Sequence, residues 1–381
     1  MSEFSVQGKI FNVDFSEQSS ILEVKSHPRP YEVEFLQGRD IHHIFDDFLK
    51  SCNEPLVLVD EKLVERHLSQ SKLIRETPIM SVAVSERFKS LDGAVSILNF
   101  MSAQKVGRGS TFLVVGGGIL QDVGAFAAGV YKRGIPWVYM PTTLLAQADS
   151  CIGSKSGLNF MGAKNVLGMF SAPRKIFIHP SFLNTLPQED IESGLGEAFR
   201  LSIIGGEISL KLFEELLPSS LERDQGSLKR IVQLALRIKR SVIEVDEFEL
   251  DLRRSMNFGH SVGHAIEALT DYQIPHGTAV AFGLLVENEL STQRDMLPKV
   301  DRDRILRIGS NLISASTREI LRKMDITGII DILHKDKKTE GGVLKLVVLQ
   351  RIGNVRFIDF PLTKTAVPAL QYALKSVLEK I

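Results

Sequence analysis

The chain is poor in several residue types, and each shortage excludes a class of protein. Cys52 and Cys151 are the two cysteines in 381 residues. They are too few for a disulfide framework, and with no paired-cysteine metal motif we expect ordinary thiols in a reducing cytoplasm. Neither charge is in excess, because Lys plus Arg and Asp plus Glu both number 46. No global field therefore draws the chain to nucleic acid or an anionic membrane, and any anion recognition must be local.

Long hydrophobic runs are also missing. The longest apolar stretch, residues 111–130, contains glycines, Gln121 and Asp122, which argue against a membrane span. The first residues, Met1–Val6, carry an early acid and no basic region followed by an apolar run, so no targeting segment is predicted. We expect a soluble, cytoplasmic protein.

The length and the apolar pattern predict two domains. A single core stops growing at roughly 250 to 300 residues, which this chain exceeds. In the first half, strand-like runs such as Pro55–Asp60 and Ser110–Val115 alternate with helical stretches such as Phe88–Ala103. This alternation favours a parallel sheet with crossover helices.

Strand signals fade after Pro187, and helical patterns take over. These patterns cover residues 188–200, 226–245, 253–270 and 278–294. We therefore expect an α/β domain over residues 1–186, with residues 1–30 as an extension that includes strand-like Phe4–Phe15, and a helical domain over residues 187–381.

A stripe of titratable side chains is the most informative feature of the second half. Arg253, Asn257, His260, His264 and Glu267 are spaced by four, three, four and three residues, which places them on one side of a helix. One hypothesis is a zinc site, in which His260, a histidine from the His-Gly turn at residues 276–277 and a carboxylate from elsewhere leave open coordination positions. The alternative is that these histidines are satisfied core or capping groups. Their clustering favours the site.

The carboxylate for such a site has one candidate upstream. Glu197 and Arg200 lie one turn apart in a helical segment. Glu197 is either half of a helix-surface ion pair or the missing ligand, and spacing leaves both readings open.

In the first half, three glycines follow a buried strand. Gly116, Gly117 and Gly118 would let the backbone approach a pyrophosphate at a helix N-terminus. The match to the dinucleotide fingerprint is incomplete, because Gln121 stands where its last glycine would be. A tight turn without ligand is the alternative. Glu86, in the first turn of the preceding helix, could bind a ribose hydroxyl or simply be solvated.

Cations among small residues form a second cluster. Arg133, Lys155, Lys164 and Asn165 lie among glycines and serines that allow close approach. Each cation alone would be an ordinary surface residue, but together they favour a cradle for phosphate or another anion.

Four sequence blocks occur in the order found in one enzyme family. They are Gly-Gly-Gly-x-x-x-Asp, Pro-Thr-Thr-Leu-Leu-Ala-x-x-Asp-Ser, Gly-Leu-x-Glu and Asn-Phe-Gly-His-x-x-Gly-His-Ala-Ile-Glu. The chain resembles the 3-dehydroquinate synthase family from about Tyr31 to its C-terminus, most specifically between Gly116 and Gly277. The resemblance implies an N-terminal Rossmann-like nucleotide-binding α/β domain with a parallel sheet and a C-terminal all-α metal-binding domain. It also implies a homodimer whose site lies in the cleft between the domains.

The resemblance also implies roles for individual residues. Zn²⁺, or Co²⁺ in its place, would be held by Glu197, His260 and His276, with His264 beside them in the active site. The positions implied for NAD are Asp60, Glu86, Lys89, Gly116, Gly117, Gly118, Asp122, Thr142, Thr143, Asp149, Lys155 and Lys164. Those implied around the substrate are Asp149, Lys155, Asn165, Arg200, Lys239, Arg253, Asn257, His264 and one of the pair Lys337 and Lys338, taken as Lys338. Arg133 would reach the substrate phosphate from the neighbouring subunit.

The reaction implied is that of a sugar phosphate cyclase. NAD transiently oxidises 3-deoxy-arabino-heptulosonate 7-phosphate, phosphate is eliminated, the hydride returns, and an internal aldol step closes 3-dehydroquinate. Three departures from the family pattern bear on the substrate: Arg200 replaces a lysine, Ser154 replaces a glycine, and the N-terminus is extended. They leave open a sedoheptulose 7-phosphate cyclase or another cyclitol-forming synthase, although Asn257 and His264 favour the heptulosonate.

Two alternatives belong to other functional classes. An NAD- and metal-dependent polyol dehydrogenase would release its reduced cofactor, but the cation cluster disfavours it. A catalytically silent NAD-binding protein would be expected to lack Glu197, His260 or His276, and all three are present.

Overall fold

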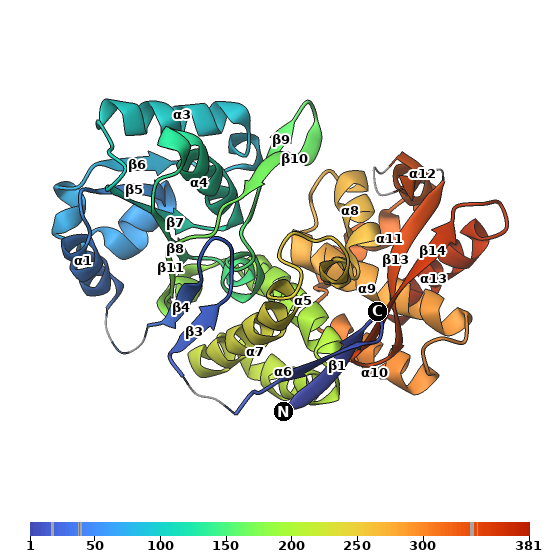
Figure 1. The fold of residues 1–381 in the computed structure, drawn as a ribbon. Coiled ribbons are helices and arrows are strands. Elements are labelled where there is room, and N and C mark those ends of the chain that lie inside the picture. Colours follow the sequence, from blue (N-terminus) through green and yellow to red (C-terminus); the bar gives the residue numbers. More distant parts are fainter. Residues whose placement is uncertain (17–18, 37, 39, 336–338, 341) are drawn as a thin grey trace. The chain divides into compact units, whose positions relative to one another are not determined.

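The computed structural model describes the whole chain apart from residues 17–18, 37, 39, 336–338 and 341. Contacts divide the chain into two compact units. Residues 18–186 form one, here called the α/β unit, and residues 1–17 together with 187–381 form the other, the helical unit. Figure 1 labels the helices and strands of both units.

The α/β unit is built on a seven-stranded sheet. Its strand order is β3 (Ile21–Val24), β4 (Tyr31–Phe35), β11 (Lys175–Ile178), β8 (Trp137–Pro141), β7 (Thr111–Gly116), β5 (Pro55–Asp60) and β6 (Ile79–Val82). All neighbours are parallel except β3, which is antiparallel to β4. The predicted parallel sheet is confirmed.

Both faces of this sheet are buried, which explains its continuous apolar strands. Alternate residues such as Val57, Leu113 and Val115 pack in a core with α1 (Ile41–Ser51). The intervening residues face α4 (Gly118–Val130), where a β-carbon on Gly124 would lie 2.7 Å from a Val114 methyl. Helix α3 (Leu91–Ala103) packs beside α4 (Figure 1).

Shorter elements complete the α/β unit. The hairpin β9 (Lys155–Phe160) and β10 (Ala163–Phe170) forms a separate two-stranded sheet. The remaining turns are α2 (Glu61–Leu63), η1 (Val64–Leu68), η2 (Leu73–Arg75), η3 (Glu86–Phe88), η4 (Tyr131–Arg133), η5 (Ala146–Ser150) and η6 (Pro180–Thr185). Cys52 and Cys151 carry free thiols, as expected.

The helical unit is dominated by long helices. They are α5 (Gln188–Ile204), α6 (Glu207–Leu221), α7 (Gln225–Ile243), α8 (His260–Leu269), α9 (His276–Gln293), α10 (Lys299–Ser310), α11 (Ala315–Lys323), α12 (Ile326–Lys335) and α13 (Val367–Lys380), with the short 3-10 helix η7 (Leu252–Asn257). Helix α9 is central, since fifteen consecutive residues, 277–291, are buried and it contacts α5, α8, α10 and α13.

This unit also contains a sheet that the sequence analysis did not expect. Its order is β12 (Thr339–Glu340), β13 (Val343–Arg351), β14 (Asn354–Pro361), β1 (Ser2–Val6) and β2 (Lys9–Val13). The assignment of residues 1–30 to the first domain is therefore wrong for residues 1–17. They belong to the helical unit because β1 pairs with β14 in parallel and Arg237 of α7 donates to the Asp14 carbonyl at 3.0 Å. The blue N-terminal hairpin lies among yellow and red elements in Figure 1.

The predicted helix over residues 253–270 is interrupted. Gly259 has φ +78°, a left-handed conformation that separates η7 from α8. Its N–H donates to Oε2 of buried Glu287 at 2.7 Å, and a β-carbon there would lie 2.5 Å from the Val280 carbonyl oxygen. Arg253 and Asn257 thus lie on a different element from His260 and His264.

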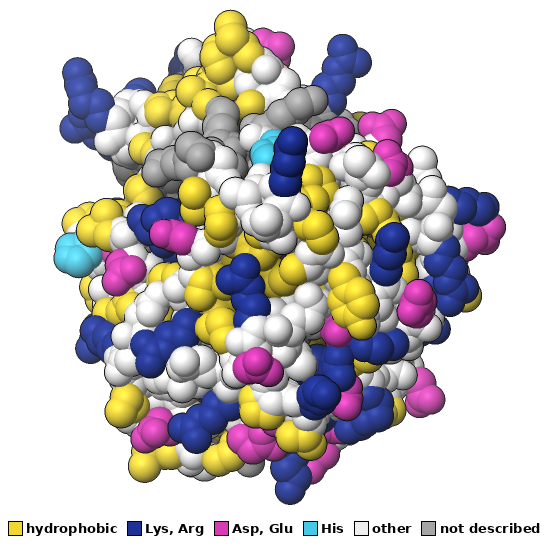
Figure 2. All heavy atoms as spheres, turned by 90° about the vertical axis from the view of Figure 1, so that its right-hand side faces the viewer, with side chains coloured by type: hydrophobic (Ala, Val, Ile, Leu, Met, Phe, Trp, Pro, Cys, Tyr) yellow, Lys and Arg dark blue, Asp and Glu magenta, His cyan; other side chains and the backbone are white. Residues whose placement is uncertain are grey.

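Among the described helices, none is both long and apolar enough to cross a membrane. On the face shown in Figure 2, the coloured Lys and Arg side chains are interspersed with Asp and Glu, so the described charges there do not gather by sign.

Buried Glu289 connects three helices of this unit. It accepts a hydrogen bond from Arg302 of α10 and another, at 3.1 Å, from Nζ of Lys380 in α13. Burial alone would raise the pKa of Glu289, but these two cations outweigh burial and lower it. The ionised Glu289 therefore contributes stability at pH values above its unfolded-state pKa of about 4.3. This contribution is lost as the pH falls through the lower pKa of Glu289 in the folded state.

We predict that Glu289→Gln lowers the free energy of unfolding by about 2 kcal/mol at pH 7, because two charge-assisted bonds weaken. The difference from wild type should shrink as pH falls below about 4. Urea unfolding at pH 7 and at a pH below about 4 measures the free energies of unfolding of the variant and of wild type. The control is Glu319→Gln, which removes an exposed ion pair with Lys323 and should change the free energy of unfolding little. An equal loss of unfolding free energy at both pH values would contradict the claim that the ionised form of Glu289 stabilises the unit.

Candidate functional site

Helices α5 and α9 approach so closely that only glycine fits at their contact. A β-carbon on Gly277 would lie 1.8 Å from the Ser193 carbonyl oxygen, and one on Gly196 would lie 2.2 Å from the Gly277 carbonyl oxygen. The N–H of Gly277 also donates to Oγ of Ser193 at 2.9 Å. Glu197 directly follows Gly196, and His276 directly precedes Gly277. The backbone contact of the two helices therefore places Glu197 beside His276.

Helices α8 and α9 are packed in the same way. A β-carbon on Gly283 would lie 2.2 Å from the Gly259 carbonyl oxygen and 2.7 Å from the Gly263 nitrogen. His260 and His264 project from α8, and His276 is the first residue of α9. The expectation that His276 lies in a turn is wrong, because α9 begins at His276, directly after its N-cap residue Pro275.

The three candidate ligands converge. Oε1 of Glu197 lies 3.6 Å from Nε2 of His260 and 3.3 Å from Nε2 of His276. We call Glu197, His260 and His276 the metal set. The Glu197 side chain is only 1% exposed, and among the described residues Oε1 accepts no hydrogen bond of good geometry.

The second nitrogen of each imidazole has an acceptor. Nδ1 of His260 lies 3.2 Å from the Phe258 carbonyl oxygen, and Nδ1 of His276 lies 3.0 Å from Oε2 of Glu267. Acceptors at Nδ1 hold the proton on that nitrogen, so Nε2 is the nitrogen of each ring that a metal would bind. Glu267 was part of the sequence stripe, but its role in orienting His276 emerges only from the fold.

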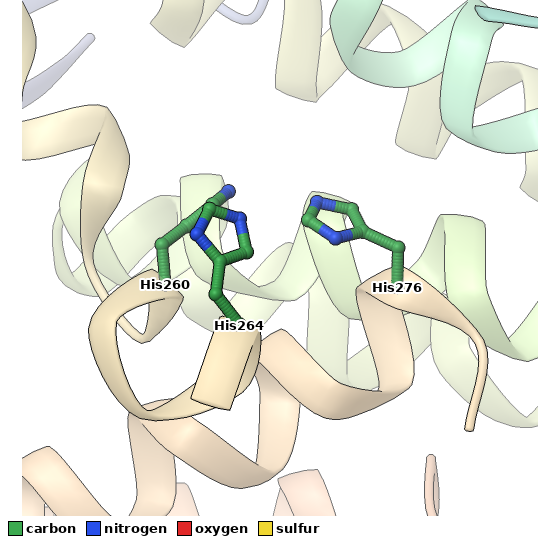
Figure 3. Close-up of side chains that lie close together, drawn as sticks. All are labelled: His260, His264 and His276. Atoms are coloured by element: carbon green, nitrogen blue, oxygen red, sulfur yellow. The ribbon is translucent and has the colours of Figure 1, made fainter. Parts of the chain in front are cut away.

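His264 completes a cluster of three imidazoles. Ligand nitrogens of His260, His264 and His276 all lie within 4.8 Å of one another. Figure 3 shows the three rings turned toward a common space, two from α8 and one from α9. The His264 ring is 5.3 Å from that of His260 and 5.5 Å from that of His276.

Charge in this cluster is balanced by buried ion pairs. Burial alone would raise the pKa of Glu197, but Arg200, His260 and His276 hold it well below its usual range. Burial alone would lower the pKa of His276, yet Glu197 and Glu267 outweigh this and raise it. Glu197 is therefore ionised, and metal binding at His276 must displace a proton.

This arrangement fits a divalent metal. Two imidazole nitrogens and one carboxylate oxygen are a donor set typical of catalytic zinc, which keeps further positions open. A buried carboxylate oxygen without a hydrogen bond among the described residues is costly unless a cation completes it. The arrangement therefore favours the metal-site hypothesis over the alternative of satisfied core histidines.

We predict that His276→Ala loses most of the zinc retained after desalting, because one of three ligands is removed, while its far-ultraviolet circular dichroism stays that of wild type. Exposed His334 on α12 provides the control, since His334→Ala should retain zinc. Full zinc content in His276→Ala, measured by elemental analysis, would rule out this ligand set.

Other predicted substrate residues lie in the same unit. Arg253 and Lys239 are buried, each about 5% to 6% exposed. Arg253 donates to the Glu247 carbonyl, and Nδ2 of Asn257 donates to Oε1 of Glu249 at 2.8 Å. The sequence analysis missed Glu249. Its eight-residue distance from Asn257, across a loop and a 3-10 turn, gave no helical spacing to reveal the contact.

In the α/β unit, the three glycines lie at the carboxyl end of β7. Gly117 caps α4, and a β-carbon there would lie 3.0 Å from the Thr143 methyl group. Thr142 donates its N–H to the Gly116 carbonyl at 3.1 Å. Asp60 ends the neighbouring β5 and caps the next helix. The strand order reverses between β5 and β7, and parallel sheets bind ligands at such a point.

Lys89, Asp122 and Glu86 are held by the β9–β10 hairpin. Nζ of Lys89 lies 2.6 Å from Oδ2 of Asp122, whose Oδ1 accepts from the Gly157 N–H at 3.0 Å. Oε1 of Glu86 accepts from Asn159 at 2.7 Å. The structure thus joins the predicted ribose-binding glutamate to the hairpin that carries Lys155, Lys164 and Asn165.

The cations of the predicted anion cradle are exposed. Lys155 begins β9, and Lys164 and Asn165 lie on β10. Asp149 is half-buried in η5. Ser154, at the position of the family glycine, adopts φ +57° and is 7% exposed, and within the described part of the chain its hydroxyl has no hydrogen-bond partner.

Arg133 is exposed on η4 with φ +64°, in the α/β unit. Lys337 and Lys338 lie outside the described residues.

A parallel-sheet unit with a glycine turn at its switch point, followed by a helical unit that gathers two imidazoles and a carboxylate, is the architecture of dehydroquinate synthase-like enzymes. Family comparison agrees: the 3-dehydroquinate synthase N-terminal model matches residues 79–193, and the C-terminal model matches residues 194–339. The chain belongs to the 3-dehydroquinate synthase family.

Curated relatives carry the same family name. The 3-dehydroquinate synthase of Streptococcus pyogenes serotype M5 (strain Manfredo) is 36% identical over 253 residues, which cover 66% of this chain and 69% of the relative. That of Streptococcus equi subsp. equi (strain 4047) is 31% identical over 364 residues, covering 94% and 98%.

Similar solved structures include cyclitol-forming enzymes. A 2-deoxy-scyllo-inosose synthase complexed with carbaglucose-6-phosphate, NAD⁺ and Co²⁺ matches with a TM-score of 0.81 and 20% identity, over 93% of this chain and 99% of that one. The 2-epi-5-epi-valiolone synthase from Streptomyces hygroscopicus subsp. jinggangensis 5008, with NAD⁺ and Zn²⁺ bound, matches with a TM-score of 0.76 and 23% identity, over 97% and 100%. These likenesses establish the shared fold, and the predicted fold class is confirmed.

Proposed function

We propose that this chain is a sugar phosphate cyclase that converts 3-deoxy-arabino-heptulosonate 7-phosphate to 3-dehydroquinate and phosphate, with NAD and Zn²⁺ or Co²⁺ as cofactors. The observation that carries the proposal is the convergence of Oε1 of Glu197 on Nε2 of His260 and His276, in a chain of the 3-dehydroquinate synthase family. The cofactors named for the two similar cyclitol-forming structures support the cofactor assignment.

When bound, NAD would accept and return a hydride, and the metal would polarise the substrate hydroxyl. The metal set holds the ion, and Glu267 orients His276 through Nδ1. His264 has a ring nitrogen within 4.8 Å of the metal-set imidazoles. Histidine is the usual side chain for general acid–base catalysis, so we assign His264 the relay of substrate protons.

Charged side chains supply binding of the anionic groups. Elimination leaves negative charge on the departing phosphate, which fixed cations stabilise. We assign this task to Lys155 and Arg133, while buried Arg253 and Lys239 orient the rest of the substrate together with Asn257. Asp149, Lys164 and Asn165 complete the polar set proposed for cofactor and substrate, and Lys338 is retained from the family pattern.

The glycine turn and its neighbours are assigned to NAD. Gly116, Gly117 and Gly118 leave room for a pyrophosphate at the start of α4, near Thr142 and Thr143. Asp60, Glu86, Lys89 and Asp122 provide polar groups around this edge of the sheet.

The substrate assignment is tested by phosphate release from zinc-loaded protein with NAD, while NADH absorbance is followed. We expect release from 3-deoxy-arabino-heptulosonate 7-phosphate without accumulation of NADH, because the hydride returns within each turnover. Release only from sedoheptulose 7-phosphate would move the chain to the cyclitol-forming branch, for which strained Ser154 beside Lys155 is the structural argument. Steady NADH formation on polyols without phosphate release would contradict the cyclase proposal.

We also propose a homodimer in which Arg133 acts on the neighbouring subunit's substrate. Arg133 is exposed at the surface of the α/β unit, which supports this proposal. The subunit arrangement itself is part of the proposal.

Complementation of two inactive variants tests this. In a mixed dimer of Arg133→Ala and His276→Ala subunits, one site would combine an intact metal set with the arginine of its partner. Random co-assembly should therefore restore about a quarter of wild-type turnover. No recovery, with mixed dimers verified by differential tags, would mean that Arg133 acts within its own subunit or not at all.

A further inference from the structure

Arg200 and Glu197 form an ion pair that gives the two carboxylate oxygens different tasks. Nε of Arg200 lies 2.8 Å from Oε2 of Glu197, and Nη2 lies 2.7 Å from the same oxygen. Oε1 instead faces Nε2 of His260 and His276 at 3.6 and 3.3 Å. The guanidinium thus binds one oxygen of Glu197, and the other oxygen faces the two histidines.

The pair is protected from water. Both side chains are 1% exposed, and Nη1 of Arg200 contacts the Met256 sulfur at 3.7 Å. Charge-assisted bonds are stronger in such an environment than at the surface, and the planar guanidinium fixes their direction. Turning the carboxylate away from this orientation would break both bonds at once.

This restraint has a consequence for coordination. A carboxylate can bind a metal through one oxygen or two, and a two-oxygen mode occupies a position that a substrate oxygen would otherwise take. With Oε2 bonded twice to Arg200, Oε1 is the oxygen that remains for the ion.

We propose that Arg200 is a positioning residue that restricts Glu197 to ligation through Oε1 and so keeps a metal position open. This inference rests on the proposed function in one respect, that the metal set binds an ion. It replaces the expectation that Arg200 contacts the substrate. The lysine usual in the family would offer a single compact charge at this position, so the two-bond restraint is a property of the arginine.

Cobalt binding to the full-length protein tests the proposal without relying on turnover. The dissociation constant is measured by competition with a chelator, and the visible absorption of bound Co²⁺ reports its coordination number, since fewer ligands give more intense bands. Arg200→Met should weaken binding about 10- to 100-fold, as loss of a ligand-orienting partner does. It should also give weaker bands, because Glu197 can then supply both oxygens. Arg200→Lys should fall between Arg200→Met and wild type.

Arg302→Met is the matched control. It also removes a guanidinium from a buried glutamate of the helical unit, Glu289, but that glutamate is not in the metal set. It should unfold at lower urea than wild type yet keep the Co²⁺ affinity and spectrum of wild type. A change in both variants would assign the effect to general destabilisation and overturn the proposal.

The outcomes separate this inference from the proposed function. If wild type binds Co²⁺ and Arg200→Met binds it as tightly or more tightly with the same spectrum, the positioning role is wrong and the metal set stands. If wild type binds no Co²⁺, or His276→Ala binds it like wild type, the metal set itself is wrong. Should Arg200→Met fail to fold, the spectrum of Arg200→Lys decides, and one identical to that of wild type overturns the proposal.

Discussion

Helices α5 and α9 touch through their backbones at Gly196 and Gly277, and the geometry of the proposed metal set depends on that contact. Any side chain at Gly277 would collide with the Ser193 carbonyl, so the helices could not come together. Separating them would move Glu197 away from His276, although neither residue itself had changed. The glycines of α8 and α9 perform the same task for His260. Close packing of small residues thus brings three polar groups from three helices to one point.

Polar contacts behind the metal set then determine how its atoms face one another. Arg200 bonds to one oxygen of Glu197, Glu267 accepts from one nitrogen of His276, and the Phe258 carbonyl lies at one nitrogen of His260. Each ligand is left with a single atom directed at the common point. Such preorganisation matters because buried charges are tolerated only when their partners are in place. The same logic explains why Glu289 stabilises the unit elsewhere, where no metal is implied.

Much of the fold followed from local patterns, and the exceptions all involve partners distant in sequence. Apolar runs predicted β5 and β7, because strands buried on both faces carry that signature, and helical spacing predicted α5, α7 and α9. The break at Gly259 was missed since periodicity continues across it, and only Glu287 and Val280 of α9 account for its left-handed backbone. The pairing of β1 with β14 has no local signal. At the site, the histidines, the glycines and the one-turn spacing of Glu197 and Arg200 were visible in the sequence, whereas the contacts of Glu267 and Glu249 required the tertiary structure.

The central claim is that Glu197, His260 and His276 together hold one divalent ion. Its most direct test is a crystal structure of the zinc-loaded protein with anomalous diffraction measured on both sides of the zinc absorption edge. We expect a single strong anomalous peak bonded to Oε1 of Glu197 and to Nε2 of both histidines, with Oε2 still bonded to Arg200. A peak bound through His264 in place of Glu197, or no peak at this cluster, would contradict it.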